Sequence, residues 1–148
     1  TILNKAQTLL EALEDLTWEN YVDIANELTR CDKHEIDDEM ARQASIYSYY
    51  QGLLSVAKRN LDEASLVLTK YCAQTRKDRK EGCSVKQTAK DLDDYVESSD
   101  EFQVYNREMN EAQFKYTLLK GLVSSLEQKK DMLVQMSSQR RAETNLYR

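Results

Sequence analysis

The chain has 148 residues, of which 32% are charged and 41% hydrophobic, and its formal net charge is -5. It contains 3 Gly and no Pro, where an average chain of this length has about 10 Gly and about 7 Pro. Because β-sandwiches and barrels need frequent turn residues, and phosphate-binding loops need clustered glycines, the composition excludes both classes. We therefore predict an all-α chain with one modest core.

The first part of the chain predicts two helices. The segment Thr1–Leu16 places its apolar residues at helical spacing. It is also acidic and amphipathic, unlike a secretory signal, so we expect no leader peptide. Thr17 is a good N-cap and predicts a second helix from Trp18 to about Arg30.

A long third helix is expected next, capped by Asp37 or Asp38 and fading between Arg76 and Gly82. Its apolar residues mostly alternate in steps of three and four, which is typical of a bundle or coiled-coil seam. The predicted seam is Met40, Tyr47, Tyr50, Leu54, Ala57, Leu61, Ala64, Leu68 and Tyr71. Ile46, Leu53, Val56 and Val67 widen it, so we expect contacts with more than one neighbour.

Two sequence patterns of the capping-box type predict the remaining helices. Ser84-Val85-Lys86-Gln87 predicts a short helix, and Ser98-Ser99-Asp100-Glu101 opens the last long helix, which we expect to end at Arg140-Arg141. The predicted fold is therefore all-α, with two long amphipathic helices plus two to three short helices. We expect one continuous domain built from residues 1–83 and 84–148, with its core completed by homo-oligomerisation.

Charge is arranged in blocks, with a net of -8 over residues 1–40, +6 over 41–90, -7 over 91–111 and +4 over 112–148. The densest basic stretch, residues 70–90, is opposed only by Asp78 and Glu81. This stretch is either a solvated connection between helices or a patch that binds a polyphosphate backbone. Its candidate binding residues are Arg76, Lys77, Arg79, Lys80, Lys86 and Lys90, with Lys58 and Arg59 on the same helix.

Tyr71 follows Lys70 and is the best candidate in the sequence for stacking on bases of single-stranded nucleic acid. Packing in the core is the alternative for this residue, as it is for the other tyrosines. Nine of the twelve aromatic residues are Tyr.

Catalytic and metal sites are poorly supported. Cys31 and His34 supply two of the four ligands that a structural zinc needs, and no second such pair exists. No pattern combines a nucleophile, a base and oxyanion donors. We expect no enzyme activity, no cofactor and no metal. Three cysteines without tight spacing indicate thiols in a reducing cytoplasm, and no apolar run is long enough to span a membrane.

The order of these features resembles the UvsY family of phage recombination mediator proteins, over roughly Tyr21 to Glu143. The resemblance rests on the segment Glu35–Tyr50, the basic cluster Arg76-Lys77-Asp78-Arg79-Lys80, the short helix that follows, and two segments of the closing helix. These two segments are Leu118-Leu119-Lys120-Gly121-Leu122 and Lys129-Lys130-Asp131-Met132-Leu133.

The resemblance implies a protein without enzyme activity in the cytoplasm of an infected bacterial host. It implies binding of single-stranded DNA, contact with the phage single-strand-binding protein, loading of the phage RecA-like recombinase, and a ring-like homo-oligomer. Arg76, Lys77 and Arg79 match the family's basic DNA-contacting motif. The closing helix would carry oligomerisation, through Tyr116, Leu119, Val123, Leu126, Leu133 and Met136. The alternative is a helical structural or adaptor protein, such as a phage virion component, without a nucleic-acid role.

Overall fold

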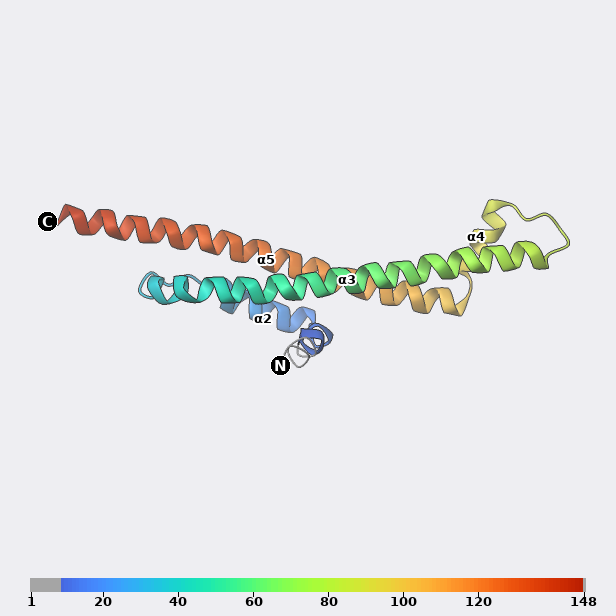
Figure 1. The fold of residues 1–148 in the computed structure, drawn as a ribbon, viewed down its shortest axis with the longest axis horizontal. Coiled ribbons are helices and arrows are strands. Elements are labelled where there is room, and N and C mark those ends of the chain that lie inside the picture. The colour runs from blue at the N-terminus through green and yellow to red at the C-terminus, as the bar shows by residue number, and fades with distance from the viewer. Residues whose placement is uncertain (1–8, 148) are drawn as a thin grey trace. The chain divides into compact units, whose positions relative to one another are not determined.

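The structure is a computed structural model that describes residues 9–147. Residues 9–14 are helical and are followed by α2 (Trp18–Thr29), α3 (Ile36–Gly82), α4 (Ala89–Glu97) and α5 (Asp100–Leu146) (Figure 1). No strand occurs between residues 9 and 147. The predicted all-α class with two long helices is confirmed, since α3 and α5 have 47 residues each. The start of the predicted first helix, residues 1–8, lies outside the described residues.

The chain forms two compact units. Unit 1 consists of Thr1–Val56 with Thr117–Arg148, and unit 2 is Ala57–Tyr116. Each long helix therefore contributes one part to each unit. The two predicted segments, 1–83 and 84–148, likewise each contribute to both units. None of the helices in the described part is long and apolar enough to cross a bilayer.

The predicted start of α2 is confirmed in detail. The Thr17 hydroxyl accepts a hydrogen bond from the Asn20 backbone N–H, and the Asn20 side-chain oxygen accepts one from the Thr17 backbone N–H at 2.8 Å. This reciprocal pair satisfies two backbone donors that the first turn of a helix leaves unpaired. The helix ends at Thr29, one residue before the predicted end.

Three predicted helix ends are wrong by a few residues. α3 already begins at Ile36, so Asp37 and Asp38 lie in its first turn, where their charges oppose the helix dipole, rather than at the cap. In α5, the Ser99 hydroxyl accepts from the Phe102 backbone N–H, so Ser99 rather than Ser98 caps the helix. Helix α5 also continues past Arg140 to Leu146.

The predicted capping box at Ser84 is also wrong. Residues 83–88 are not helical, and α4 begins at Ala89. The Thr88 hydroxyl accepts from the Asp91 backbone N–H, and the Asp91 carboxylate accepts from the Thr88 N–H at 3.0 Å. Aspartate has replaced the usual Glu or Gln of the capping box, and the short helix therefore starts one turn later than predicted.

The core of unit 1 is lined mainly by α5 and α3. Its buried apolar residues are Leu13, Leu16, Ile36, Leu53, Leu118, Leu119, Leu122, Val123, Leu126 and Leu133. The predicted seam of α3 is correct at Ala57 and Leu61, which are buried in unit 2, but Met40 is 40% exposed. Val67, predicted to widen the seam, is 45% exposed, whereas Leu53 is among the best-buried residues of the helix.

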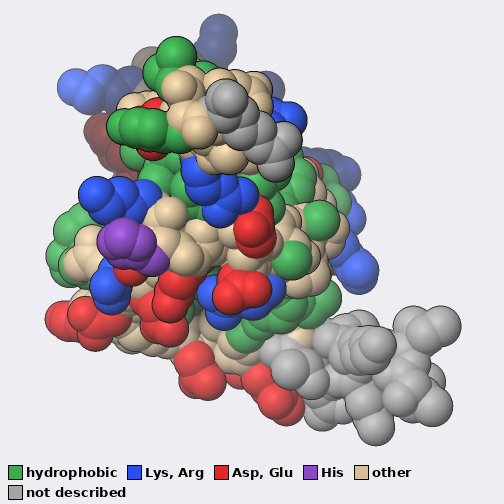
Figure 2. Space-filling view, turned by 90° about the vertical axis from the view of Figure 1, so that its left-hand side faces the viewer, with side chains coloured by type: hydrophobic (Ala, Val, Ile, Leu, Met, Phe, Trp, Pro, Cys, Tyr) green, Lys and Arg blue, Asp and Glu red, His purple; other side chains and the backbone are tan. Residues whose placement is uncertain are grey.

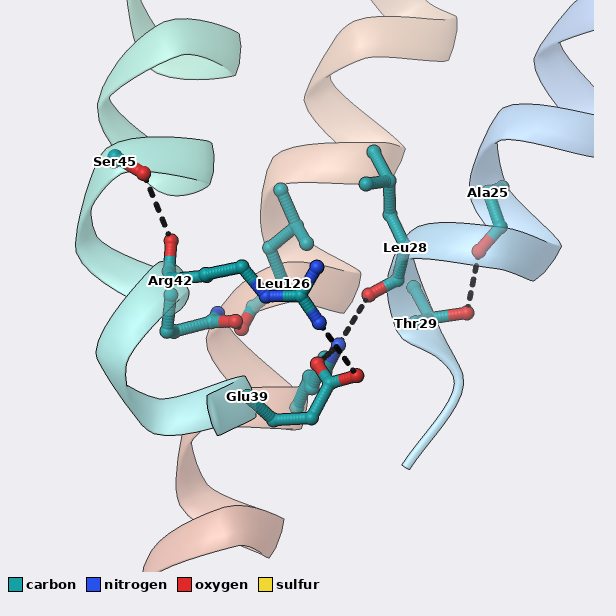
Figure 3. A network of polar contacts seen from close by, with 9 residues as sticks. Ala25, Leu28, Thr29, Glu39, Arg42, Ser45 and Leu126 are labelled. Atoms are coloured by element: carbon teal, nitrogen blue, oxygen red, sulfur yellow. Dashed lines mark hydrogen bonds and ion pairs between the residues drawn. The ribbon is translucent and has the colours of Figure 1, made fainter. Parts of the chain in front are cut away.

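Three helices of unit 1 meet where Leu28, Glu39 and Leu126 lie close together (Figure 3). Lys129 of α5 joins them and is only 3% exposed. Its ammonium group lies 2.5 Å from Glu39 on α3 and donates to the Leu28 carbonyl at the end of α2 at 2.7 Å. Nearby, the Gln43 side chain donates to the Leu126 carbonyl at 2.8 Å. These polar contacts fix the register of α2 and α3 against α5 inside a mainly apolar core.

Candidate nucleic-acid interface

The predicted basic cluster lies on the last turns of α3, and the contacts of its side chains divide it into two sets. Arg76 and Arg79 face α4, where Arg76 pairs with Asp93 and Arg79 stacks on Tyr95. Lys77 and Lys80 are exposed and form no ion pair with any of residues 9–147. The structure thus separates arginines that are used within unit 2 from lysines that face solvent.

Arg76 is held by an acid from the neighbouring acidic block. Its Nε donates to a carboxylate oxygen of Asp93 at 2.9 Å, and a second guanidinium nitrogen lies 2.8 Å from the same oxygen. Both side chains are about half exposed. An exposed pair of this kind contributes little to stability, but it neutralises part of the positive charge that the sequence assigns to this region.

Five lysines in this region form no ion pair anywhere among residues 9–147. They are Lys70, Lys77, Lys80, Lys86 and Lys90, and all five are exposed. We call them the lysine set. Of the two acids of the stretch, Asp78 accepts a hydrogen bond from Gln74, one turn earlier on α3. The lysine set therefore presents positive charge that the described part of the chain does not neutralise.

Several cations of unit 1, in contrast, are paired with acids of that unit. Arg140 lies 2.7 Å from Asp37, Lys130 lies 3.6 Å from Asp131, and Lys129 binds Glu39. On the face shown in Figure 2, Asp and Glu side chains gather along one side with Lys and Arg next to them. This mixture of signs is the ordinary surface of a stable helical protein.

Lys58 and Arg59, the other predicted cations, are each paired one turn along α3. Lys58 lies 2.7 Å from Asp62, and Arg59 lies 3.1 Å from Glu63. The hydrogen bond to Asp62 raises the pKa of Lys58, and its ammonium group also lies 5.7 Å from the centre of the Tyr116 ring. Both cations are exposed, but neither belongs to the lysine set, because each is paired with an acid.

Tyr71, the predicted stacking residue, makes two contacts within unit 2. Its ring packs against Tyr105 of α5 with the centroids 5.3 Å apart, and its hydroxyl lies 2.7 Å from that of Ser99. Both contacts hold Tyr71 inside unit 2, so the alternative of core packing applies. Sequence reasoning missed Tyr95 of α4, which is 44% exposed and carries the Arg79 guanidinium 4.5 Å from its ring centre.

Tyr95 also borders a hollow of about 320 Å³ in unit 2. The other lining residues are Thr75, Asp78, Arg79 and Gly82, all on the last turns of α3. The Arg79 Nε is buried and has no hydrogen-bond partner between residues 9 and 147. The hollow is therefore lined by an aromatic residue, an arginine and an aspartate.

The residues predicted for oligomerisation lie mainly in the core of unit 1. Leu119, Val123, Leu126 and Leu133 are buried by the chain's own helices, and Tyr116 and Met136 are half-buried. Their apolar periodicity is thus used within a single chain. Oligomerisation stays a prediction, and it must involve other surface than the four buried residues.

The described residues contain no group of three or more His, Cys, Asp and Glu side chains arranged to hold a metal ion. Cys31, Cys72 and Cys83 are thiols, each half-buried. Comparison of the chain with protein-family models, curated proteins and solved structures gave no match.

Proposed function

We propose that this protein binds single-stranded DNA without sequence specificity and acts as a recombination mediator. The observation that carries the proposal is the lysine set, five exposed lysines within 21 residues of chain, none of which is ion-paired with any residue that the structure describes. Each such lysine releases a condensed counterion when it neutralises a phosphate, and this release drives binding that depends strongly on salt.

The resemblance to the UvsY family supplies the biological part of the proposal. A mediator of this kind remodels complexes of the single-strand-binding protein with DNA and promotes loading of a RecA-like recombinase. Binding several phosphates along one strand weakens the grip of a covering protein and presents an open strand. If copies assemble into a ring, several weak patches act together at high effective concentration.

The mechanism we propose is positional and needs no bond-making step, so the protein is not an enzyme. Lys77, Lys80 and Lys86 neutralise phosphates, and the paired Arg76 contributes after exchanging Asp93 for a phosphate. Since Arg76 and Asp93 are both about half exposed, this exchange requires little desolvation.

A helical structural or adaptor protein, such as a phage assembly component, is the second candidate. It is favoured by apolar side chains of unit 2 that are not buried by the chain's own helices. Leu66 and Val67 on α3 are 54% and 45% exposed, and Val104 on α5 is 49% exposed. These residues suit contacts between copies or with another helical protein.

The test is binding of a single-stranded oligonucleotide by fluorescence anisotropy across a salt series. The triple variant Lys77→Gln/Lys80→Gln/Lys86→Gln removes three members of the lysine set. We expect the slope of log affinity against log salt to fall by about 2, because each phosphate contact on a single strand contributes about 0.7.

The matched control is Lys33→Gln/Lys120→Gln/Arg141→Gln, which removes three exposed cations of unit 1 that have no ion pair in the described part of the chain. This control lowers the net charge equally and is expected to keep the slope of the unmodified protein. Equal slopes for the two triple variants would refute the assignment of the binding surface. A stable oligomer that binds no oligonucleotide at low salt would favour the structural alternative.

The mediator role needs its own measurement. Adding the protein to single-stranded DNA coated with a phage single-strand-binding protein is expected to restore DNA-dependent ATP hydrolysis by the phage RecA-like recombinase. The lysine-set variant is expected to lose this effect and the unit 1 control to retain it. Unchanged stimulation by the lysine-set variant would contradict the proposed mechanism.

A further inference from the structure

The hollow bordered by Tyr95 differs from the rest of the basic region. A phosphate is bound well by exposed lysines, and it gains nothing from an aromatic ring. The hollow instead holds Arg79 against Tyr95, with Asp78 and Thr75 on its rim. Its chemistry therefore points to a ligand that is flat and that carries both hydrogen-bond acceptors and donors.

Arg79 is the clearest sign of a missing partner. Within the described residues, its guanidinium forms no ion pair and no hydrogen bond, and its Nε is buried. A buried donor without an acceptor costs free energy, and this cost is recovered if the Arg79 side chain turns its Nε–H toward an acceptor bound in the hollow. Asp93 lies two residues before Tyr95 on α4, and its carboxylate is already paired with Arg76.

Asp78 sets the second requirement. Its carboxylate accepts one hydrogen bond from Gln74 at 2.8 Å and has capacity for more. The same negative charge disfavours a second anion in the hollow, so a free phosphate or a carboxylate is a poor occupant. An uncharged ring with an amino group meets the needs of Asp78 and of Arg79 together.

We propose that this hollow binds a base of single-stranded DNA that carries an exocyclic amino group. The base stacks on the exposed part of the Arg79–Tyr95 pair, as bases stack on aromatic and guanidinium planes in other single-strand binders. A ring nitrogen or carbonyl oxygen accepts from Arg79, and the amino group donates to Asp78, as cytosine N4 donates to carboxylates. Thymine has no amino group and fits less well.

This inference rests on the proposed binding of single-stranded DNA. It adds a site that binds a base to the surface that binds phosphates. The lysine set accounts for affinity and salt dependence. The hollow accounts for a preference between strands that carry the same number of phosphates.

The experiment compares three oligonucleotides of equal length in the same anisotropy assay: oligodeoxycytidylate, oligothymidylate and a strand of abasic sites. Since stacking of a base is worth about 1–3 kcal/mol on alanine substitution, we expect oligodeoxycytidylate to bind at least about fivefold tighter than the abasic strand. Oligothymidylate is expected to lie between them.

In Tyr95→Leu, we expect the difference between oligodeoxycytidylate and the abasic strand to disappear, while the affinity for the abasic strand and its salt slope stay unchanged. Tyr95→Phe keeps the ring and is expected to keep the difference. Tyr49→Leu is the matched control, because Tyr49 of unit 1 is 42% exposed and distant in sequence from the basic stretch.

Equal binding of oligodeoxycytidylate and the abasic strand by the unmodified protein would overturn the base site alone, because salt-dependent binding of the abasic strand still reports the phosphate contacts. A difference that survives in Tyr95→Leu would overturn it as well. Failure to bind any of the three strands would overturn the base site together with the proposed function.

Discussion

The buried ammonium group of Lys129 lies 2.5 Å from the carboxylate of Glu39, across the contact between α5 and α3. Only 2% of the Lys129 side chain and 14% of the Glu39 side chain are exposed. Burying either charge alone is costly, and the pair is tolerated because each neutralises the other. A third element takes part, since the carbonyl of Leu28 accepts from the same ammonium group (Figure 3).

Replacing Glu39 with Leu is therefore expected to destabilise unit 1 by about 3–5 kcal/mol, because the buried ammonium loses its counter-charge. Urea unfolding followed by the fluorescence of Trp18, the one tryptophan of the chain, measures this directly. Trp18 lies on α2 in unit 1, where its ring stacks on Tyr21.

The double variant Glu39→Leu/Lys129→Met is expected to recover most of that loss, because it removes both buried charges and keeps the apolar volume. Lys130→Met is the neighbouring control. Since Lys130 is exposed and pairs only with Asp131 at 3.6 Å, its replacement is expected to change the free energy of unfolding by less than about 0.5 kcal/mol. A double variant as unstable as Glu39→Leu would contradict this account.

Gln43 offers the opposite prediction. It is 6% exposed, and its side-chain oxygen has no hydrogen-bond partner. The Gln43→Met substitution removes that unsatisfied oxygen, while the Leu126 carbonyl retains its place in the backbone ladder of α5. We expect the free energy of unfolding to stay equal or to rise by about 1 kcal/mol, whereas Leu126→Ala is expected to lower it by about 2–5 kcal/mol. A large loss on Gln43→Met would contradict this account.

The hydroxyl of Tyr47 on α3 donates to the carboxylate of Glu127 on α5 at 2.9 Å, and this bond raises the pKa of Tyr47 above its ordinary value of 10.0. The folded chain holds this proton more tightly than the unfolded chain. The resulting stabilisation is complete below pH 10.0 and is lost as pH rises through the raised pKa.

Ultraviolet absorbance during alkaline titration detects this effect. We expect Tyr47→Phe to remove one late-titrating tyrosine, and Glu127→Gln to return the Tyr47 pKa toward its ordinary value. Tyr50 provides a comparison, because burial is the main cause that raises its pKa. The Glu127→Gln substitution is expected to leave Tyr50 unchanged, and an equal shift of both residues would argue against the specific bond.

The capping box of α4 is accessible by NMR. Hydrogen bonds from the Thr88 hydroxyl and backbone lower the pKa of Asp91 below its ordinary 3.8. The stability that this carboxylate gives to α4 is therefore present above pH 3.8 and is lost as pH falls through the lowered pKa. We expect Thr88→Val to raise the Asp91 pKa, and Ser84→Ala to leave it unchanged. A change of the Asp91 pKa in Ser84→Ala would favour the helix start predicted at Ser84.

Helix ends differ in how far the sequence predicts them. Thr17 is identified from local spacing because the bonds of its capping box join residues three apart. Ser84 and Thr88 both precede a polar residue three positions later, and local rules favour the Ser84 pattern because it ends in Gln. The structure selects Thr88, and α4 then places Val96 in the core of unit 2. That choice depends on packing, which no local pattern contains.

The candidate site was predicted in part for the same reason. Composition and spacing identify the basic end of α3. The partners of its arginines cannot be derived in this way. Arg76 pairs with Asp93, which lies 17 residues later in the chain, and Arg79 stacks on Tyr95. Both partners come after the non-helical segment 83–88, so their positions depend on the path of that segment. Tyr71 could be given two interpretations, stacking or core packing, because nothing in the sequence shows that Tyr105 packs on its ring.

Segment 83–88 contains the exposed Lys86 and connects α3 to α4. Unit 1 is built from residues on both sides of this segment, and so is unit 2. A single proteolytic cut after Lys86 would therefore not release one unit from the other. It would leave two fragments, each holding one long helix and an incomplete part of both cores, so that separating the fragments would take both units apart. Each fragment needs the other to complete both cores, and mixing the two fragments would therefore rebuild both cores together.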